Sequence, residues 1–324
     1  MSDSLSHIAV LGAGAWGAAM ALAAHGAGRQ VSLWVREDDV LADISAGRGN
    51  RFLPGVTLPK DMAVTGNLAQ ACKADALLVV VPAQVLHRFA NSLEPHLKPG
   101  QPLVICAKGI EKGSGKLVTE VVAEVLPGAD LAILSGPSFA RDVAKGLPTA
   151  VTIAAKGDLA SRLQTALGSA SFRPYASDDL TGVALGGAAK NVYAIACGVV
   201  EGMGLGENAR AALLARSFAE LARLGEALGA KRETLMGLSG LGDLVLTATS
   251  KSSRNFLFGA ALGAGEKPGA ALAEGVDTAP ALVARARSVN IEMPIAEAMA
   301  DLLSGALPLG EAMLRLMSRK LKAE

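Results

Sequence analysis

A glycine-spaced turn near the N-terminus constrains the fold of this chain more than any other feature. It lies within His7–Gly17, HIAVLGAGAWG, where the apolar run at residues 8–11 is typical of a short buried strand and residues 18–24 follow as an Ala-rich helix. Between them the glycines recur with the spacing G-x-G-x-x-G, at Gly12, Gly14 and Gly17. A strand, a glycine turn and a helix in this order predict a dinucleotide-binding site.

Each residue of this turn has an expected task. Gly12 permits the tight turn, Gly14 lets a pyrophosphate approach the backbone, and Gly17 lets the helix pack closely on the strand. The free N–H groups of the first helical turn then face the phosphates. Trp16 lies inside the loop, where its indole either covers the cofactor or packs into the core.

Composition excludes several other classes of protein. The chain has 324 residues, enough for about two domains, and its net charge of +1 and aromatic content of 3% argue against a nucleic-acid partner. Its cysteines are far apart in sequence and form no C-x-x-C, at Cys72, Cys106 and Cys197. This usage predicts a reduced, cytoplasmic protein without a disulfide framework or a cysteine zinc site.

The uncharged stretch at residues 8–24 resembles a signal peptide or a membrane span. The six residues before His7 contain no Lys or Arg, so the basic region of a signal peptide is missing. The stretch is also slightly short for a bilayer and contains three glycines. We therefore expect a soluble protein with no stable membrane insertion.

Further strands are predicted at residues 31–35, 77–81, 103–106 and 131–134, and extended segments at 149–154 and 172–175. Helical segments such as 116–125 lie between them, and this alternation predicts a Rossmann-like, doubly wound α/β sheet. From Asp178 onward nearly every segment is predicted to be helical. We expect a dinucleotide-binding domain at 1–180 and an all-α substrate and dimerisation domain at 181–324.

Three predictions mark the ends of the first helices of the second domain. Asp178 and Asp179 suit the N-cap of a long apolar helix that follows them. Glu207–Asn208 is predicted to cap the next helix, which should end at Gly229.

Residues at the ends of the strands are the first candidates for ligand contacts, because ligands of doubly wound folds bind there. Arg36 follows the second strand, at a position where NAD-preferring folds carry an acidic residue. It either pairs with the 2′-phosphate of NADP or is a solvated surface arginine. Glu37, the next residue, is an acid that could bind NAD instead. Lys108 and the run Gly136-Pro137-Ser138 lie at later strand ends. A lysine in such a position is often only a boundary residue.

The second domain contributes the strongest candidate. Lys190 lies in an otherwise apolar helix beside small residues that would let a ligand approach, and burial of a lysine shifts its pKa toward a catalytically useful range. The alternative is a lysine that reaches solvent from the helix edge. All four histidines, His7, His25, His87 and His96, lie in the first third of the chain. A lysine is therefore favoured over a histidine as the acid/base, and no metal-ligand spacing is present, so we expect metal-free chemistry.

A polar run in the second domain is the other candidate. Gly240 and Gly242 precede Asp243, and donors follow at Ser253, Arg254 and Asn255. Such a cluster suits a phosphate ester, with arginine as the bidentate partner. The alternative is a polar surface loop.

Taken together, the motifs resemble those of the bacterial NAD(P)-dependent glycerol-3-phosphate dehydrogenases. The matches run in order over about 270 residues: Gly12–Gly17, Asn50–Gly55, Val81-Pro82, Lys108-Gly109, Gly136–Ala140, Lys190–Ala196, Gly204–Asn208, Gly240–Leu244, Ser253–Asn255 and Glu274-Gly275. The chain departs from the family at Ala248, where cysteine is expected, and at Phe256 and Leu257, where basic residues often follow.

The resemblance implies reversible reduction of dihydroxyacetone phosphate to sn-glycerol 3-phosphate with NADPH or NADH, for phospholipid synthesis, in a homodimer. Lys190 would be the general acid/base, with Lys108 and Asp243 at the reacting centre. The substrate site would be completed by Gly136, Ser138, Ser253, Arg254 and Asn255. The cofactor would be contacted by Ala15, Trp16, Arg36, Lys108, Ala140, Arg254, Leu272 and Glu274. Two alternatives are a 3-hydroxyacid or ketopantoate-type reductase with the same two-domain plan and a non-catalytic dinucleotide-binding sensor.

Overall fold

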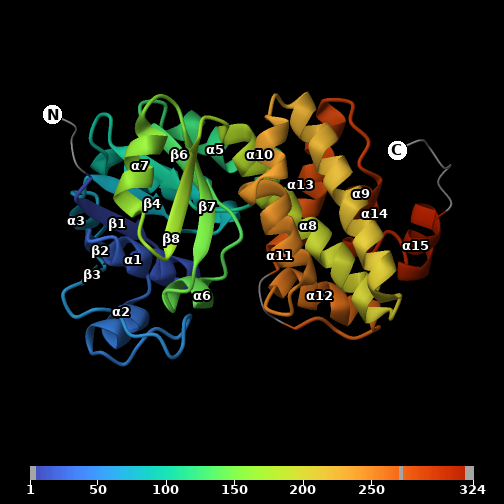
Figure 1. The fold of residues 1–324 in the computed structure, drawn as a ribbon, viewed down its shortest axis with the longest axis horizontal. Helices are drawn as coiled ribbons and strands as arrows, with labels where there is room; N and C mark the ends of the chain where they lie inside the picture. The colour runs from blue at the N-terminus through green and yellow to red at the C-terminus, as the bar shows by residue number, and fades with distance from the viewer. Residues whose placement is uncertain (1–4, 270–272, 318–324) are drawn as a thin grey trace. The chain divides into compact units, whose positions relative to one another are not determined.

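The computed structural model describes residues 5–269 and 273–317, and the chain divides into two compact units (Figure 1). The first unit comprises residues 1–108 and 118–184, and the second comprises 109–117 and 185–324. The predicted domain boundary at residue 180 falls just before the one that separates the compact units.

The first unit is built on one eight-stranded sheet of order β3-β2-β1-β4-β5-β6-β7-β8. Its strands are β1 (His7–Leu11), β2 (Gln30–Trp34), β3 (Ala63–Thr65), β4 (Ala76–Val79), β5 (Pro102–Ile105), β6 (Asp130–Ser135), β7 (Thr149–Ala155) and β8 (Phe172–Ser177). All neighbouring strands are parallel except β6 and β7. The Rossmann-like prediction is confirmed; only the short, half-exposed β3 was missed, because it has no apolar run.

Helices cover both faces of this sheet: α1 (Ala15–Gly26), α2 (Asp38–Ser45), α3 (Leu68–Ala71), α4 (Leu86–Leu93), α5 (Val118–Val125), α6 (Ala140–Ala144) and α7 (Leu159–Leu167). Ile8 and Val10 of β1 lie in one core with Met20 of α1 and Leu163 of α7. Alanines line the buried side of α1, so this helix packs closely on the strands. The close packing carries the first turn of α1 to the glycine motif.

The second unit includes the non-helical segment 109–117, where Ile110 and Leu117 form an antiparallel bridge. Its other described elements are helices, together with a π-helical turn, η3 (Leu238–Gly242). They are α8 (Leu180–Gly202), whose first residues belong to the first unit, α9 (Gly206–Ala227), α10 (Arg232–Met236), α11 (Asp243–Thr249), α12 (Arg254–Gly263), α13 (Glu274–Ser288), α14 (Pro294–Leu303) and α15 (Leu309–Met317). In the described residues α8 is long and apolar enough to cross a membrane, but that stretch is wholly buried. It is therefore a core helix.

Glycines set how closely α8 approaches its neighbours. A Cβ at Gly198 would lie 2.1 Å from the carbonyl oxygen of Phe256, and one at Gly259 would lie 2.0 Å from that of Ile195. The backbones of α8 and α12 thus touch where any side chain would clash. This contact fixes the start of α12 near the middle of α8.

Two of the capping predictions are confirmed and one is wrong. The Asp179 carboxylate accepts the N–H of Gly182 at 2.7 Å and caps α8, and Gly229 (φ +79°) ends α9. Glu207–Asn208 does not cap α9, because the helix already begins at Gly206 after Leu205. Glu207 instead lies in the first turn, where its charge suits the helix dipole.

Candidate functional site

The glycine turn of the first unit has the geometry that its spacing predicts. Gly12 has φ +121°, and a Cβ there would lie 2.4 Å from the Val80 carbonyl oxygen; a Cβ at Gly17 would lie 1.8 Å from that of Gly12. Gly14 has nothing within 4 Å of its Cβ position. The fold therefore requires glycine at two positions, and the third leaves open space beside the backbone.

This open space lies at the N-terminus of α1. Gly14 is the N-cap and provides no side-chain acceptor, so no cap engages the first-turn N–H groups of Ala15, Trp16 and Gly17. These groups and the positive end of the helix dipole suit an anion such as a pyrophosphate. The residues present thus fit a dinucleotide.

Trp16 packs against the hydrophobic core of the first unit, and its Nε1 is buried without a hydrogen-bond partner among the described residues. This supports the packing alternative for the indole, and a contact with the cofactor remains a prediction. Asn50, from the matched N-R-F-L-P-G motif, donates from Nδ2 to the Ala13 carbonyl oxygen at 2.8 Å and is buried. It ties a distant loop to the glycine turn, a role that its sequence position alone did not indicate.

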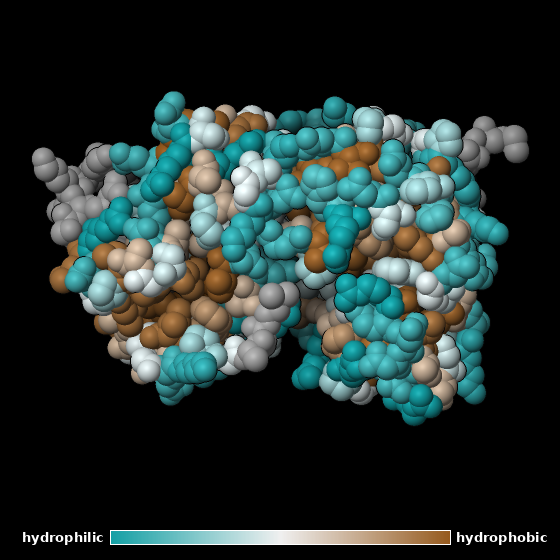
Figure 2. Space-filling model, turned by 180° about the vertical axis from the view of Figure 1, so that it is seen from behind, coloured by the Kyte–Doolittle hydropathy of each residue, from teal (hydrophilic) through white to brown (hydrophobic). Residues whose placement is uncertain are grey.

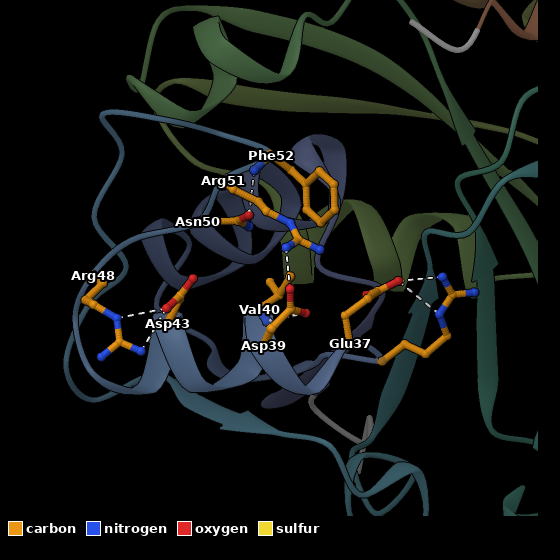
Figure 3. Close-up of polar contacts among 9 residues, drawn as sticks. Glu37, Asp39, Val40, Asp43, Arg48, Asn50, Arg51 and Phe52 are labelled. Carbon is orange, nitrogen blue, oxygen red and sulfur yellow. Dashed lines mark hydrogen bonds and ion pairs between the residues drawn. The ribbon is translucent and has the colours of Figure 1, made fainter. Parts of the chain in front are cut away.

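The ends of β2, β5 and β6 carry the other candidates of this unit. Arg36 forms an ion pair with Glu37 directly after β2 (Figure 3). Lys108 donates to the Gly136 carbonyl oxygen at 3.3 Å, and Ser138 Oγ donates to the same oxygen at 2.9 Å. The structure therefore brings Lys108, Gly136 and Ser138 together.

Gly136 and Ala140 lie in the segment between the end of β6 and the start of α6. Gly136 has φ +154°, and a Cβ would lie 2.8 Å from the Cα of Val151, so glycine lets β7 pass closely. Ala140 begins α6 directly after the G-P-S-F segment.

In the second unit, Lys190 is buried, which rules out the alternative of a lysine extended into solvent. Its Nζ forms an ion pair with Asp243 and donates to Thr247 Oγ1 at 3.1 Å. The Thr247 hydroxyl also lies 3.3 Å from the Asp243 carboxylate. Lys190, Asp243 and Thr247 thus form one buried charged cluster, and Thr247 was not among the predicted site residues.

Glycines again explain why these helices meet. A Cβ at Gly186 would lie 2.6 Å from the Ser239 carbonyl oxygen, and one at Gly240 would lie 1.9 Å from that of Leu235. The π-helical turn η3 therefore packs directly on α8 and delivers Asp243, at the start of α11, to Lys190. The absence of a side chain at Gly186 therefore makes room for the backbone of η3. The sequence had suggested that the small residues beside Lys190 make room for a ligand.

A second polar network lies near the start of α12. Asn255 donates from Nδ2 to Asn191 Oδ1 at 3.0 Å and accepts the N–H of Gly275 at 3.0 Å, so it joins α8, α12 and α13. Ser253 Oγ accepts the N–H of Phe256 at 3.2 Å and caps α12. Arg254 is the first residue of α12.

Glu274 begins α13, beside the Asn255–Gly275 contact. Asn191 Nδ2 is buried and has no hydrogen-bond partner in the described part of the chain. The network therefore links the K-N, S-R-N and E-G motifs in one place, although their roles toward ligands stay predictions. Leu272, predicted to contact the cofactor, lies outside the described residues.

The cysteines are unsuited to catalysis. Burial raises the pKa of the Cys106 and Cys197 thiols to about 12 and that of Cys72 to about 11. Within residues 5–269 and 273–317, no group of three His, Cys, Asp or Glu side chains is arranged to hold a metal ion. The charged candidate residues are thus lysines, arginines and two acids, Asp243 and Glu274.

A glycine turn on a doubly wound sheet, followed by a helical unit with a buried lysine–aspartate pair, defines a class of two-domain, dinucleotide-dependent dehydrogenases. Family models described as the N-terminus and C-terminus of NAD-dependent glycerol-3-phosphate dehydrogenase match residues 7–160 and 179–314. The chain belongs to this family, as its motifs indicated.

Individual relatives match over the whole chain. A glycerol-3-phosphate dehydrogenase [NAD(P)+] of Afipia carboxidovorans is 57% identical over 318 residues, 98% of each chain, and one of a Bradyrhizobium species is 56% identical over the full length of both. The crystal structure of glycerol-3-phosphate dehydrogenase from Coxiella burnetii has a TM-score of 0.92 and 38% identity, covering 97% of this chain and 99% of that one.

Proposed function

We propose that this chain catalyses the reversible reduction of dihydroxyacetone phosphate to sn-glycerol 3-phosphate with NADH or NADPH, and that the product supplies phospholipid synthesis. The observation that carries the proposal is the buried cluster of Lys190, Asp243 and Thr247. Burying a charged pair in a helical core costs desolvation energy that an apolar pair of similar size would avoid, so its presence here favours a role other than stability. Family membership supports a dehydrogenase that acts on this substrate.

The first unit would hold the cofactor. The N–H groups at the start of α1 would bind the pyrophosphate beside Gly14, where the backbone is open. When bound, the nicotinamide supplies the hydride that reduces the carbonyl carbon. We also assign Ala15, Trp16, Arg36, Lys108, Ala140, Arg254 and Glu274 to cofactor contacts.

Lys190 would act as the general acid of the reduction. Lys190 Nζ forms an ion pair with the Asp243 carboxylate and donates to Thr247 Oγ1, and these two contacts would orient the Nζ atom. The lysine then donates a proton to the alkoxide that develops on the substrate and accepts it back in the oxidation. Lys108 would add positive charge that stabilises the same oxygen.

Arg254 is our candidate for binding the substrate phosphate. It is the first residue of a ten-residue helix, so its guanidinium and the helix N-terminus both favour an anion. The side chains of Ser253 and Asn255 hold α12 and its neighbours together, and we propose that they complete the substrate site with Gly136 and Ser138.

The experiment that tests this function compares three candidate substrates in one assay. NADPH and NADH absorbance is followed with dihydroxyacetone phosphate, unphosphorylated dihydroxyacetone and ketopantoate. We expect turnover of the phosphorylated triose, a very low kcat/KM for dihydroxyacetone because remote binding energy is lost, and no reduction of ketopantoate. Preference for ketopantoate, or no turnover of any substrate, contradicts the proposal.

Arg254→Ala should remove most of the discrimination between the phosphorylated and unphosphorylated triose. Arg254→Lys should restore only part of it, because an ammonium lacks the planar fork of the guanidinium. If the preference survives in Arg254→Ala, another group binds the phosphate.

We also propose a cytoplasmic homodimer. Apolar side chains gather over a wide area of the helical unit on the face in Figure 2, which supports burial of part of that unit in a subunit contact. Sedimentation equilibrium across a range of protein concentrations measures the mass, and a monomer at all concentrations contradicts the dimer.

A further inference from the structure

The segment after α2 is fastened to the glycine turn and carries charged residues of its own. The Asn50 side-chain amide donates to the Ala13 carbonyl oxygen. Its oxygen accepts the N–H of Phe52 at 2.9 Å (Figure 3). Residues 50–52 are therefore held by one buried amide. Arg51, between them, is thereby fixed beside the proposed cofactor site.

Two arginine–carboxylate pairs lie at the start of α2. Arg36 pairs with Glu37, the N-cap of the helix, and Arg51 pairs with Asp39, its second residue (Figure 3). Their side chains are solvent-accessible, with Arg36 and Arg51 65% and 50% exposed. Both guanidiniums therefore remain within reach of a ligand that competes for them.

Arg51 is also restrained on a second side. Its guanidinium carbon lies 5.1 Å from the centre of the Phe52 ring, a cation–π contact. The hydrogen bond from Arg51 keeps the pKa of the Asp39 carboxyl below its usual value, so the carboxylate is charged near neutral pH. Arg51 is thus placed in advance and needs little ordering to bind an anion.

We propose that Arg51 is a second determinant of cofactor choice and that the 2′-phosphate of NADP displaces Asp39 from it. A phosphate dianion offers more charge and more acceptor oxygens than one carboxylate, so it competes well for a guanidinium. With NAD the Arg51–Asp39 pair stays closed, and Glu37 is the acceptor for the ribose hydroxyls. The inference rests on the proposed binding of the cofactor at the glycine turn.

The same exchange explains how one site serves both cofactors. Arg36 follows β2, where the adenosine ribose binds in doubly wound folds, and Arg51 reaches the first turn of α2 from the later loop. Each arginine has its own carboxylate, so neither is an unpaired positive charge when the 2′-phosphate is absent.

The test measures the dissociation constants of NADPH and NADH by nucleotide fluorescence, together with kcat/KM on dihydroxyacetone phosphate. Arg51→Gln should weaken NADPH binding about tenfold or more, the loss of one charged hydrogen bond, and change NADH binding less than about twofold. Asp39→Asn should tighten NADPH binding, because Arg51 is released from its competitor.

The chain provides a matched control. Arg48 forms an exposed ion pair of the same kind with Asp43, in the later part of α2. Arg48→Gln should leave the binding of both nucleotides unchanged. If Arg51→Gln weakens NADPH and NADH equally, or behaves like Arg48→Gln, the inference is overturned.

Binding and turnover separate this inference from the function on which it rests. A wild-type chain that binds both nucleotides but does not reduce dihydroxyacetone phosphate contradicts the proposed reaction, while the effect of Arg51→Gln on binding still decides the role of Arg51. A wild-type chain that binds neither nucleotide overturns both.

Discussion

The two units of this chain hold charge in opposite ways. In the first, the charged pairs near the proposed cofactor site, Arg36–Glu37 and Arg51–Asp39, are exposed, and the proposed anion site is made of backbone N–H groups. In the second, the side chains of Lys190 and Asp243 are only 9% and 1% exposed. An exposed pair contributes at most about 1 kcal/mol, whereas removal of one partner of a buried pair costs about 3–5 kcal/mol.

This difference separates the parts of the site that are free to change partner from those that are not. Exposed arginines are screened by water and exchange a carboxylate for a phosphate at small cost. A buried ammonium has no such alternative, so its carboxylate and hydroxyl partners must be present for the helices to pack. We therefore expect substitutions at the buried Lys190–Asp243 pair to affect stability and turnover together, and those near α2 to affect ligand choice alone.

The largest effects should come from the buried pair. Lys190→Met should lower kcat by roughly 10²–10⁴-fold, because proton donation is lost, and leave nucleotide binding intact. It should also lower the free energy of unfolding by about 3–5 kcal/mol, since Asp243 remains buried without its partner. Steady-state kinetics and urea unfolding measure the two losses.

The double substitution Lys190→Met with Asp243→Leu separates stability from catalysis. Without a buried charge it should regain most of the stability and none of the turnover. The exposed pair Lys112–Asp277 is the control, and Lys112→Met should change neither quantity. Near-normal kcat in Lys190→Met is incompatible with its role as the acid.

Glycine substitutions test the backbone site of the first unit. Gly17→Ala should cost about 3 kcal/mol of stability, because its Cβ would overlap the Gly12 carbonyl oxygen. Gly14→Ala should fold normally, since nothing lies within 4 Å, yet bind nucleotides poorly. Thermal unfolding and fluorescence titration measure these effects; Gly14→Ala with normal nucleotide affinity would show that the cofactor does not approach there.

A smaller effect is expected at Glu220, a buried acid that the sequence did not single out. Its carboxylate accepts the N–H groups of Ile295 and Ala296 at 2.8 and 3.3 Å and caps α14. Glu220→Gln should cost about 2 kcal/mol, the strength of a charged hydrogen bond. The exposed Glu226 is the control, and a loss in Glu220→Gln no larger than in Glu226→Gln contradicts the capping role.

The smallest expected effect is the contribution of His7 to the pH dependence of unfolding. Burial lowers the pKa of His7 below its usual 6.5. The unfolded chain therefore binds this proton at a higher pH than the folded chain, so the stabilising contribution is present above pH 6.5 and is lost as the pH falls through the lower pKa of the folded state. Urea unfolding at several pH values should show a shallower decline in His7→Gln. An identical decline would assign the pH dependence to other groups.

The sequence by itself determined the parts of this protein that rest on local physical chemistry. The spacing of Gly12, Gly14 and Gly17 specified a turn that requires glycine at Gly12 and Gly17, and apolar runs specified most strands of the sheet. Asp179 and Gly229 marked the beginning and end of helices through contacts with their near neighbours. Lys190 was conspicuous because a charge inside an apolar helix has few innocuous explanations.

Only the tertiary structure decided which side chains meet. Thr247 approaches Lys190, Asn255 joins Asn191 to Gly275, and Arg51 reaches Asp39, in each case across a turn or between helices. The error at Glu207–Asn208 was local, because the helix there begins without a side-chain cap. Pairings such as Lys190–Asp243, 53 residues apart, depend on how closely glycine-lined backbones pack, and no periodicity along the chain encodes that distance.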